Sequence, residues 1–236
     1  MSPRAIETLQ KADLIACEDT RHTIKLLNHF GIRKPLTSYH DFNEEQKAQE
    51  LADRIAAGES IALVSDAGTP VISDPGYRIV RACRERGIPV ISIPGANAAM
   101  AALAASGLPT DEFLFAGFLP AKQGARREKL TALRNVTATL VFYEAPHRIE
   151  ASLRDMQEVL GDREVCAARE ITKIHEEYLF GPLSTVREAV KPIGEFVVVT
   201  AGAKEPAADA PPTTREEVLK RLGMTRNQLY DLFFKK

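Results

Sequence analysis

Short apolar segments alternate with amphipathic ones along the first half of the chain. The predicted strands are residues 13–17, 35–39, 61–64, 90–93 and 113–118. The predicted helices are residues 2–11, 20–30, 43–57, 77–86 and 96–106, and several of them end at a glycine. Apolar strands without alternating polar positions are typical of parallel sheets that helices cover on both faces. The pattern therefore predicts an α/β fold with a doubly wound parallel sheet.

Beyond a linker predicted at residues 119–124, the alternation continues less regularly. Strands are predicted at residues 139–143, 164–168, 174–180 and 196–200, and helices at residues 126–134, 147–160 and 183–190. Residues 203–214 are rich in Ala, Pro and charge, as flexible linkers are. We therefore expect two α/β domains, residues 1–118 and 119–203, followed by a linker and a small helical tail over residues 204–236.

Charge and cysteine content exclude several classes of protein. The 236 residues hold 31 Lys and Arg against 32 Asp and Glu, so the net charge of −1 gives no overall attraction to nucleic acid or a membrane. The three cysteines are far apart and form neither a disulfide framework nor a thiolate zinc motif. No apolar run is long enough to span a membrane, and residues 1–11 do not resemble a signal peptide. These features predict a cytoplasmic protein without a bound metal.

The loops after two predicted strands are the first places to look for a ligand, because doubly wound sheets bind ligands at the carboxyl ends of their strands. Residues 65–76 contain two Ser-Asp-X-Gly units, whose glycines allow close approach and whose aspartates, Asp66 and Asp74, supply acceptors. Residues 94–99 place small side chains at a helix N-terminus with free N–H groups. Tight turns and helix caps explain both segments about as well. Neither contains a dinucleotide fingerprint or a phosphate loop.

Two polar segments of the second predicted domain, residues 142–148 and 169–177, are further candidates. Helix capping is the alternative for the first segment and a solvated edge strand for the second. Glu18, Asp19 and His22 lie close in sequence, but helix capping explains them better than a metal site. Four basic side chains are candidate phosphate contacts, with solvated helix faces as the alternative. They are Lys122, Arg126, Arg148 and Arg169.

Five ordered segments resemble the rRNA small subunit methyltransferase I family of the tetrapyrrole methylase superfamily. They are residues 15–21 (Ile-Ala-Cys-Glu-Asp-Thr-Arg), 64–76, 115–120 (Phe-Ala-Gly-Phe-Leu-Pro), 142–148 and 168–177. The resemblance implies two α/β domains of the tetrapyrrole methylase type, a class III methyltransferase, with S-adenosylmethionine (SAM) in the cleft between them. It also implies a homodimer that methylates the ribose 2'-oxygen of a cytidine in the decoding centre of 16S rRNA, with the small ribosomal subunit as partner.

The resemblance also implies roles for individual residues. We expect Glu170, Lys173 and His175 to line the RNA side of the site, with Lys173 or Glu170 as the general base and Arg148 and Arg169 on phosphate. The cofactor-binding positions that it implies are Asp66, Ala67, Gly68, Val71, Ile72, Ser73, Asp74, Asn97, Ala98, Phe142 and Tyr143.

One part of the family pattern is missing. Family members have a first strand and a Gly-Thr-Pro-Ile-Gly-Asn-Leu loop ahead of the helix that begins here at Ser2, and this chain contains neither. We therefore expect the first sheet to lack a core strand and the site to lack part of its wall. Two other functions stay open: methylation of a tetrapyrrole or another small acceptor, and a non-catalytic role in RNA binding or ribosome assembly.

Overall fold

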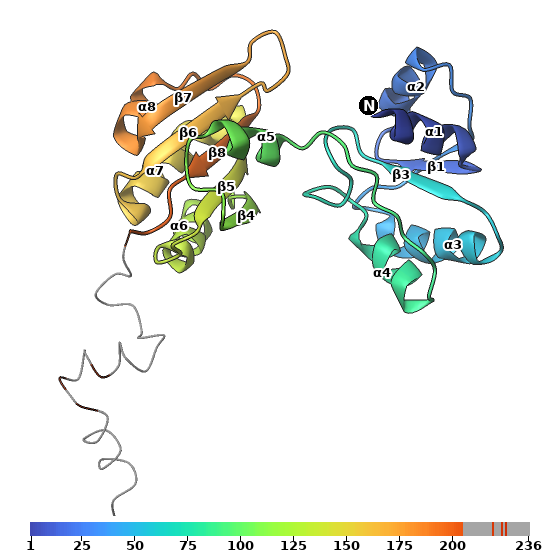
Figure 1. Ribbon diagram of the computed structural model, residues 1–236, viewed down its shortest axis with the longest axis horizontal. Helices are drawn as coiled ribbons and strands as arrows, with labels where there is room; N and C mark the ends of the chain where they lie inside the picture. Colours follow the sequence, from blue (N-terminus) through green and yellow to red (C-terminus); the bar gives the residue numbers. More distant parts are fainter. Residues whose placement is uncertain (205–218, 220–222, 224, 226–236) are drawn as a thin grey trace, which may run out of the picture.

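The computed structural model describes residues 1–204, 219, 223 and 225, and divides them mainly between two lobes. Figure 1 shows the lobes joined by an extended segment that runs from helix α4 (Tyr77–Glu85) to helix α5 (Ala98–Ala105). Among the described residues, no helix is both long enough and apolar enough to cross a membrane. Apart from the few residues named above, the tail predicted over residues 204–236 lies outside the described part of the chain.

The first lobe is a three-stranded parallel sheet, in the order β2-β1-β3, between two pairs of helices. The central strand is completely buried, and its alternate residues face opposite sides. Ile15 packs under α1 and α2, whereas Leu14 and Ala16 pack under α3 and α4. The elements are α1 (Pro3–Lys11), β1 (Leu14–Cys17), α2 (Thr20–His29), β2 (Leu36–Ser38), α3 (Glu44–Ala56), β3 (Ile61–Val64) and α4. Helices on both faces confirm the predicted doubly wound arrangement of this lobe.

Residues 90–93 do not form the predicted strand. Strand β3 pairs with β1 along one edge, and no described strand pairs along its other edge. An apolar segment becomes a strand only where a neighbouring strand offers partners for its backbone groups. Without such a partner, Ile91 is 69% exposed, and the residues of Ile61–Val64 are only half-buried.

The second lobe is a five-stranded mixed sheet in the order β4-β5-β8-β6-β7. The pair β4–β5 is parallel, and the other three pairs are antiparallel. Helices α6, α7 and α8 contribute to the core on one face, and α5 packs on the opposite face. The elements are α5, β4 (Phe113–Phe118), α6 (Gln123–Leu133), β5 (Thr139–Glu144), η1 (Pro146–Arg148), α7 (Ile149–Leu160), β6 (Glu164–Arg169), β7 (Glu177–Pro182), α8 (Leu183–Ala189) and β8 (Phe196–Thr200).

The boundary between the lobes differs from the predicted boundary at residue 118. Strand β4 pairs with β5, and α5 packs through Ala99, Ala102 and Leu103 against the second sheet. The boundary therefore lies in the segment between α4 and α5. The sequence pattern identifies residues 113–118 as a strand but contains no information about which sheet the strand joins.

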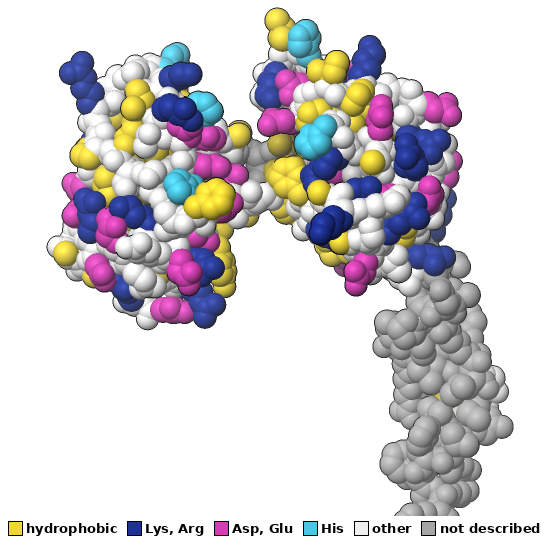
Figure 2. Space-filling model, turned by 180° about the vertical axis from the view of Figure 1, so that it is seen from behind, with side chains coloured by type: hydrophobic (Ala, Val, Ile, Leu, Met, Phe, Trp, Pro, Cys, Tyr) yellow, Lys and Arg dark blue, Asp and Glu magenta, His cyan; other side chains and the backbone are white. Residues whose placement is uncertain are grey.

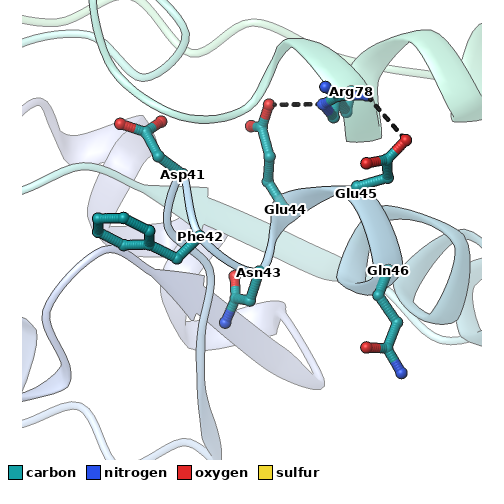
Figure 3. Close-up of a pocket in the computed structure, with 7 residues that line it drawn as sticks. All are labelled: Asp41, Phe42, Asn43, Glu44, Glu45, Gln46 and Arg78. Atoms are coloured by element: carbon teal, nitrogen blue, oxygen red, sulfur yellow. Dashed lines mark hydrogen bonds and ion pairs between the residues drawn. The ribbon is translucent and has the colours of Figure 1, made fainter.

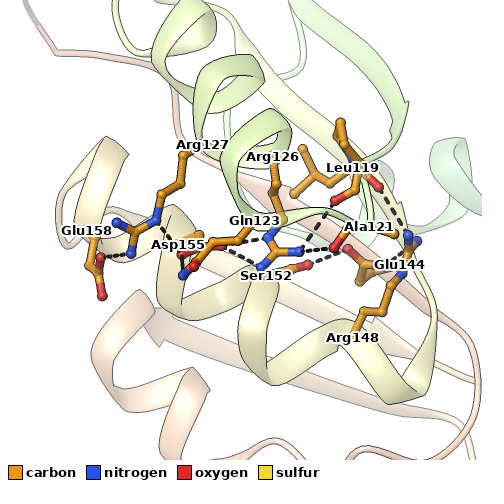
Figure 4. Close-up of polar contacts among 11 residues, drawn as sticks. Leu119, Ala121, Gln123, Arg126, Arg127, Glu144, Arg148, Ser152, Asp155 and Glu158 are labelled. Atoms are coloured by element: carbon orange, nitrogen blue, oxygen red, sulfur yellow. Dashed lines mark hydrogen bonds and ion pairs between the residues drawn. The ribbon is translucent and has the colours of Figure 1, made fainter.

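Buried charges join α6 to α7 in the second lobe, as Figure 4 shows. Asp155 is completely buried and pairs with Arg126 at 2.6 Å and with Arg127 at 2.8 Å. Burial opposes ionisation of this carboxyl, but hydrogen bonds from Arg127, Arg126 and Gln123 hold the pKa of Asp155 below its usual value. Arg126 also donates to the carbonyl of Ala121 at 3.0 Å. The network fixes the chain that enters α6.

The prediction that Arg126 contacts RNA phosphate is wrong. Its side chain is only 6% exposed, and its guanidinium is already paired with Asp155. A pattern of basic residues on a predicted helix does not distinguish an arginine that faces solvent from one that faces the neighbouring helix.

Replacing Asp155 by alanine would leave Arg126 buried without its carboxylate. Removing one partner of a buried ion pair costs about 3–5 kcal/mol, and we expect a loss of this size in the free energy of unfolding, measured by urea titration. Glu158→Ala is the matched control, because it removes the exposed partner of Arg127 and should cost less than about 1 kcal/mol. Equal losses in the two variants would contradict this account of the network.

Candidate functional site

Backbone strain marks the two loops that carry most of the predicted site residues. Among the described residues, four non-glycine residues have a positive φ: Val71, Ser73, Glu170 and Thr172. The first two lie in the loop after β3 and the other two lie between β6 and β7. A positive φ is costly for residues with a Cβ atom, above all for β-branched ones, and such strain is typical of functional sites.

The strained loop after β3 is packed directly against the strand that precedes it. Gly76 has a φ of +142°, and a Cβ atom there would lie 2.8 Å from Leu63 Cδ2 and 2.8 Å from Val71 Cγ2. Leu63 belongs to β3, and Gly76 is the N-cap residue of α4. Only glycine therefore fits between the strained segment, the sheet and the helix.

The connecting segment lies against this loop, as the predicted cofactor site requires. Thr69 donates a hydrogen bond from its hydroxyl to the carbonyl of Ala96 at 3.1 Å. The next residue, Asn97, caps α5 by accepting a hydrogen bond from the N–H of Met100 at 3.1 Å. The structure thus brings residues 65–76 close to Asn97 and Ala98, two segments that the sequence analysis assigned to one ligand.

The loop also approaches the second lobe. We call the space between the two lobes, which Figure 2 shows from behind, the notch. A Cβ atom on Gly117 of β4 would lie 3.5 Å from Ser73 Oγ. The hydroxyl of Tyr143 accepts a hydrogen bond from the N–H of Ala99, and its pKa is raised mainly by burial and further by the charge of Asp74. The loop, the start of α5 and the ends of β4 and β5 therefore meet at the notch. The sequence analysis did not single out Gly117, although the residue lies in one of the recognised motifs.

Phe142 and Tyr143 are neighbours on β5 and face opposite sides of the sheet. Phe142 is completely buried in the core that α6, α7 and α8 cover, so its side chain faces away from the predicted cofactor site. Tyr143 lies on the α5 side, where its ring contacts Phe115 at a centroid distance of 4.9 Å and Phe118 at 5.5 Å. Of the two aromatic residues, only Tyr143 is placed to contact a ligand in the notch.

Asp74 is a carboxylate whose surroundings favour a positively charged ligand. Burial raises the pKa of Asp74, a hydrogen bond from Ser65 opposes the rise, and the negative charges of Glu18, Asp66 and Asp41 add to it. A cation beside Asp74 would offset the burial and the repulsion together.

The second strained loop is held by three charged groups. Lys173 Nζ lies 2.8 Å from Glu170 Oε1 and 2.9 Å from Glu195 Oε2, and the N–H of Glu195 donates to Glu170 Oε1 at 2.9 Å. Gly194 leaves room for the Glu170 side chain, since a Cβ atom there would lie 2.7 Å from Glu170 Cδ. The sequence analysis identified Glu170 and Lys173 but not the supporting residues Gly194 and Glu195.

These contacts determine the protonation states of Lys173 and Glu170. Glu170 and Glu195 raise the pKa of Lys173, and Lys173 and the Glu195 N–H lower the pKa of Glu170. In this arrangement Lys173 is a charged ammonium at neutral pH, which can bind an anion but cannot accept a proton. Glu170 is ionised, but its Oε1 atom already accepts hydrogen bonds from Lys173 and from the N–H of Glu195. The third predicted residue of this group, His175, is exposed at the tip of the loop.

The remaining predicted phosphate contacts differ in their availability. Lys122 is exposed. Arg148 pairs with the buried Glu144 at 2.6 Å and lies over the Phe118 ring, 5.9 Å from its centroid. Arg169 pairs with Glu177 at 3.0 Å. Lys122 is therefore free to reach a phosphate, whereas the two arginines would have to share their guanidinium groups with these carboxylates.

A surface hollow of about 520 Å³ at the start of α3 contains none of the predicted site residues. Figure 3 shows Glu44 and Glu45 directed at Arg78, and the three side chains form ion pairs at 3.0 Å and 3.4 Å. Because Arg78 already pairs with both glutamates, we assign no ligand to this hollow.

Comparison with known proteins identifies the family of the chain. A sequence profile of the family described as Tetrapyrrole (Corrin/Porphyrin) Methylases matches residues 1–187. A protein from Synechocystis sp. named ribosomal RNA small subunit methyltransferase I is 50% identical over 97% of this chain and 85% of its own length. Among solved structures, the methyltransferase CobJ has a TM-score of 0.61 at 20% identity and covers 86% of this chain and 88% of its own. A uroporphyrin-III C-methyltransferase from Thermus thermophilus, in complex with S-adenosyl homocysteine, has a TM-score of 0.54 at 19% identity and covers 84% and 90%.

Replacing Gly194 by alanine would displace Glu170 and so release Lys173. We expect the pKa of Lys173, measured by NMR titration of its Nζ group, to fall toward the ordinary lysine value. Gly161→Ala is the matched control, because Gly161 has a similar φ of +86° but nothing within 4 Å of the added atom. Both variants carry the backbone strain, but only Gly194→Ala should change the Lys173 titration. The same shift in both would show that Glu170 does not control Lys173.

Proposed function

The chain belongs to the tetrapyrrole methylase family and to its ribosomal RNA small subunit methyltransferase I proteins, and we propose that it methylates a cytidine 2'-oxygen of 16S rRNA with SAM as donor. The observation that carries the proposal is 50% identity to a protein of that name over 97% of this chain. A match of this length includes both lobes, and therefore both strained loops.

The residues at the notch fit SAM as the donor. SAM supplies a methyl group on a positively charged sulfonium, and it also carries an ammonium, a carboxylate and ribose hydroxyls. Burial and the nearby carboxylates raise the pKa of Asp74, and a cationic donor beside it would offset both effects. The strained loop, Asn97 and Tyr143 add backbone and side-chain groups that can bind the polar parts of the donor. These features support residues 65–76, Asn97, Ala98 and Tyr143 as the donor site.

The second loop supports RNA as the acceptor. Methyl transfer to a ribose oxygen is an in-line displacement, in which correct positioning of the two reactants supplies much of the rate. The Lys173 ammonium pairs with Glu170 and Glu195, and its third N–H can donate to the phosphate next to the target ribose. Lys122 is exposed and can bind a further phosphate. In this proposal Glu170 positions Lys173 and does not itself touch the substrate.

A tetrapyrrole acceptor is the rival function. The solved structure named above for such an acceptor, the uroporphyrin-III C-methyltransferase, is 19% identical and therefore supports only the fold. A non-catalytic role in ribosome assembly is the second rival. The far higher identity to the rRNA methyltransferase, together with a strained loop that presents a charged lysine, favours RNA methylation over both.

We also propose that the protein acts as a homodimer in the cytoplasm. Tyr178 and Phe180 stack on β7, the edge strand of the second sheet, with ring centroids 6.2 Å apart. Phe180 is 55% exposed. Stacked rings on an open sheet edge support a contact with a second copy.

The proposed activity predicts transfer of labelled methyl from SAM to small ribosomal subunits that lack the modification. We expect the label in the rRNA, mapped by nuclease digestion and mass spectrometry to one 2'-O-methylcytidine. Uroporphyrinogen in place of the subunits should take up no label. Label in the tetrapyrrole but not in the rRNA would overturn the proposal, and SAM binding without transfer to either acceptor would favour the assembly factor.

Gly76→Ala tests the donor site. The added Cβ atom would push Val71 and Leu63 apart and move the strained loop, so we expect the Kd for SAM to rise at least tenfold, which corresponds to about 1.4 kcal/mol. Gly58→Ala is the control, because Gly58 has a φ of +107° with nothing within 4 Å. Its Kd for SAM, measured by calorimetry, should stay within about twofold of the wild-type value. An unchanged Kd in Gly76→Ala would remove this loop from the donor site.

A further inference from the structure

A hydrogen-bonded histidine–aspartate pair lies at the carboxyl edge of the first sheet. His22 is in the first turn of α2, directly after β1, and Asp66 follows β3. The two strands are parallel neighbours whose last residues, Cys17 and Val64, face each other, so the segments after them meet. His22 Nδ1 lies 3.0 Å from Asp66 Oδ2. Asp66 belongs to the same strained loop that carries the proposed donor site.

The Asp66 carboxylate is held in place from its other side. Its Oδ1 atom accepts a hydrogen bond from the N–H of Asp19 at 3.3 Å. Because an ionised carboxylate only accepts hydrogen bonds, the imidazole must donate through Nδ1. The neutral ring then has its free electron pair on Nε2. The His22 side chain is 60% exposed and that of Asp66 30%, so Nε2 is accessible to a substrate and to water.

This arrangement is the one in which a carboxylate orients a histidine for proton transfer. Building on the proposed function, we propose that His22 is the general base that accepts the proton of the ribose 2'-hydroxyl and that Asp66 positions its ring. His22 is then a catalytic residue, and Asp66 a positioning residue that acts through it.

The step is balanced in atoms and charge. The 2'-oxygen forms a bond to the methyl carbon, and the bond between that carbon and sulfur breaks, with its electron pair left on sulfur. The sulfonium becomes a neutral thioether. The 2'-hydroxyl proton moves to His22 Nε2, which makes an imidazolium that the Asp66 carboxylate stabilises. The proton then passes to solvent from the exposed ring.

Other groups at the site are less suited to this role. Lys173 is charged in its contacts with Glu170 and Glu195, and Glu170 already accepts two hydrogen bonds. The charged groups nearest His22 are Asp66 from the loop after β3 and, from its own helix start, Asp19 with the Arg21 guanidinium that pairs with it. Asp66 is the carboxylate that contacts the ring, and it stabilises the positive charge that forms on proton transfer.

A divalent cation is the competing occupant of this cluster. Ligand atoms of Asp19, His22 and Asp66 lie within 4.8 Å of one another. However, the Asp19 carboxylate already binds the Arg21 guanidinium at 2.6 Å and caps α2 through the Arg21 N–H at 2.8 Å. A cation would have to displace this pair, so the geometry favours the base over the metal site.

The test is the single-turnover rate of methyl transfer to small subunits at saturating SAM between pH 5 and pH 9. The wild-type rate should rise with pH across the range in which histidine titrates, about pH 5 to 8, and then level off. In His22→Asn the rate near pH 7.5 should fall about 100-fold or more, and the dependence on pH should disappear. The Kd for SAM should stay within about twofold.

Two further variants separate a catalytic role from a structural one. His29→Asn is the matched control, because His29 is exposed at the other end of the same helix, and its rate and pH profile should equal those of wild type. Asp66→Asn should lower the rate, because the His22 ring loses the carboxylate that orients it and stabilises its positive charge. Unfolding temperatures of all three variants should stay close to wild type, since the substituted side chains are partly exposed.

The outcomes are distinguishable. If His22→Asn retains a rate within threefold of wild type and the same pH profile, the base assignment is overturned while the proposed function stands. If chelation abolishes the wild-type rate and Mg²⁺ restores it, the cluster is a metal site and the base assignment is again overturned. If wild type itself fails to methylate the rRNA, the proposed function fails, and this inference falls with it.

Discussion

Strand β8 is the element on which the chemistry of the second lobe depends. Its five residues are buried, and it pairs antiparallel with β5 on one side and with β6 on the other. The registers place Val197 opposite both Tyr143 and Ala168. The ring at the notch and the start of the strained loop therefore reach the same end of the sheet. A register shift of one residue would turn Tyr143 to the face where Phe142 is buried and empty the notch of its aromatic contact.

The two strained loops use the same structural solution. In each, a glycine lacks the Cβ atom that would collide with the strained residues: Gly76, at the end of the first loop, lies beside Val71, and Gly194, on a neighbouring segment, lies beside Glu170. The strain persists because packing and charge pairs on both sides leave the loops no relaxed alternative. Side chains on such loops are arranged before a substrate arrives, and this matters for a reaction whose rate comes largely from positioning.

The elements whose formation depends on local sequence could be predicted, and those that depend on a distant partner could not. Strand β1, its flanking helices and the capping role of Asp19 follow from apolar pattern and capping chemistry, and the structure confirms them. Residues 90–93 have the same pattern, but no strand among the described residues pairs with them. The site residues also divide into those indicated by local sequence and those that depend on a distant partner. The loop of residues 65–76 was recognisable from its glycines and aspartates, whereas the burial of Arg126 and Phe142 depends on which face packs inward. The pairing of His22 with Asp66 joins residues 44 positions apart, and no local signal indicates it.

The two lobes carry different charges at the proposed site, and each lobe favours a different substrate. The first lobe supplies carboxylates at the notch, among them Glu18, Asp66 and Asp74, which attract a cationic donor and repel phosphate. The second lobe supplies the Lys173 ammonium, which keeps one N–H for a phosphate beside its pairs with Glu170 and Glu195. In the arrangement that we propose, an RNA strand lies along the second lobe with its uncharged ribose directed toward the carboxylates. The donor and the proton acceptor then come from one lobe and the phosphate contact from the other, so the reaction requires both lobes to hold the two substrates together.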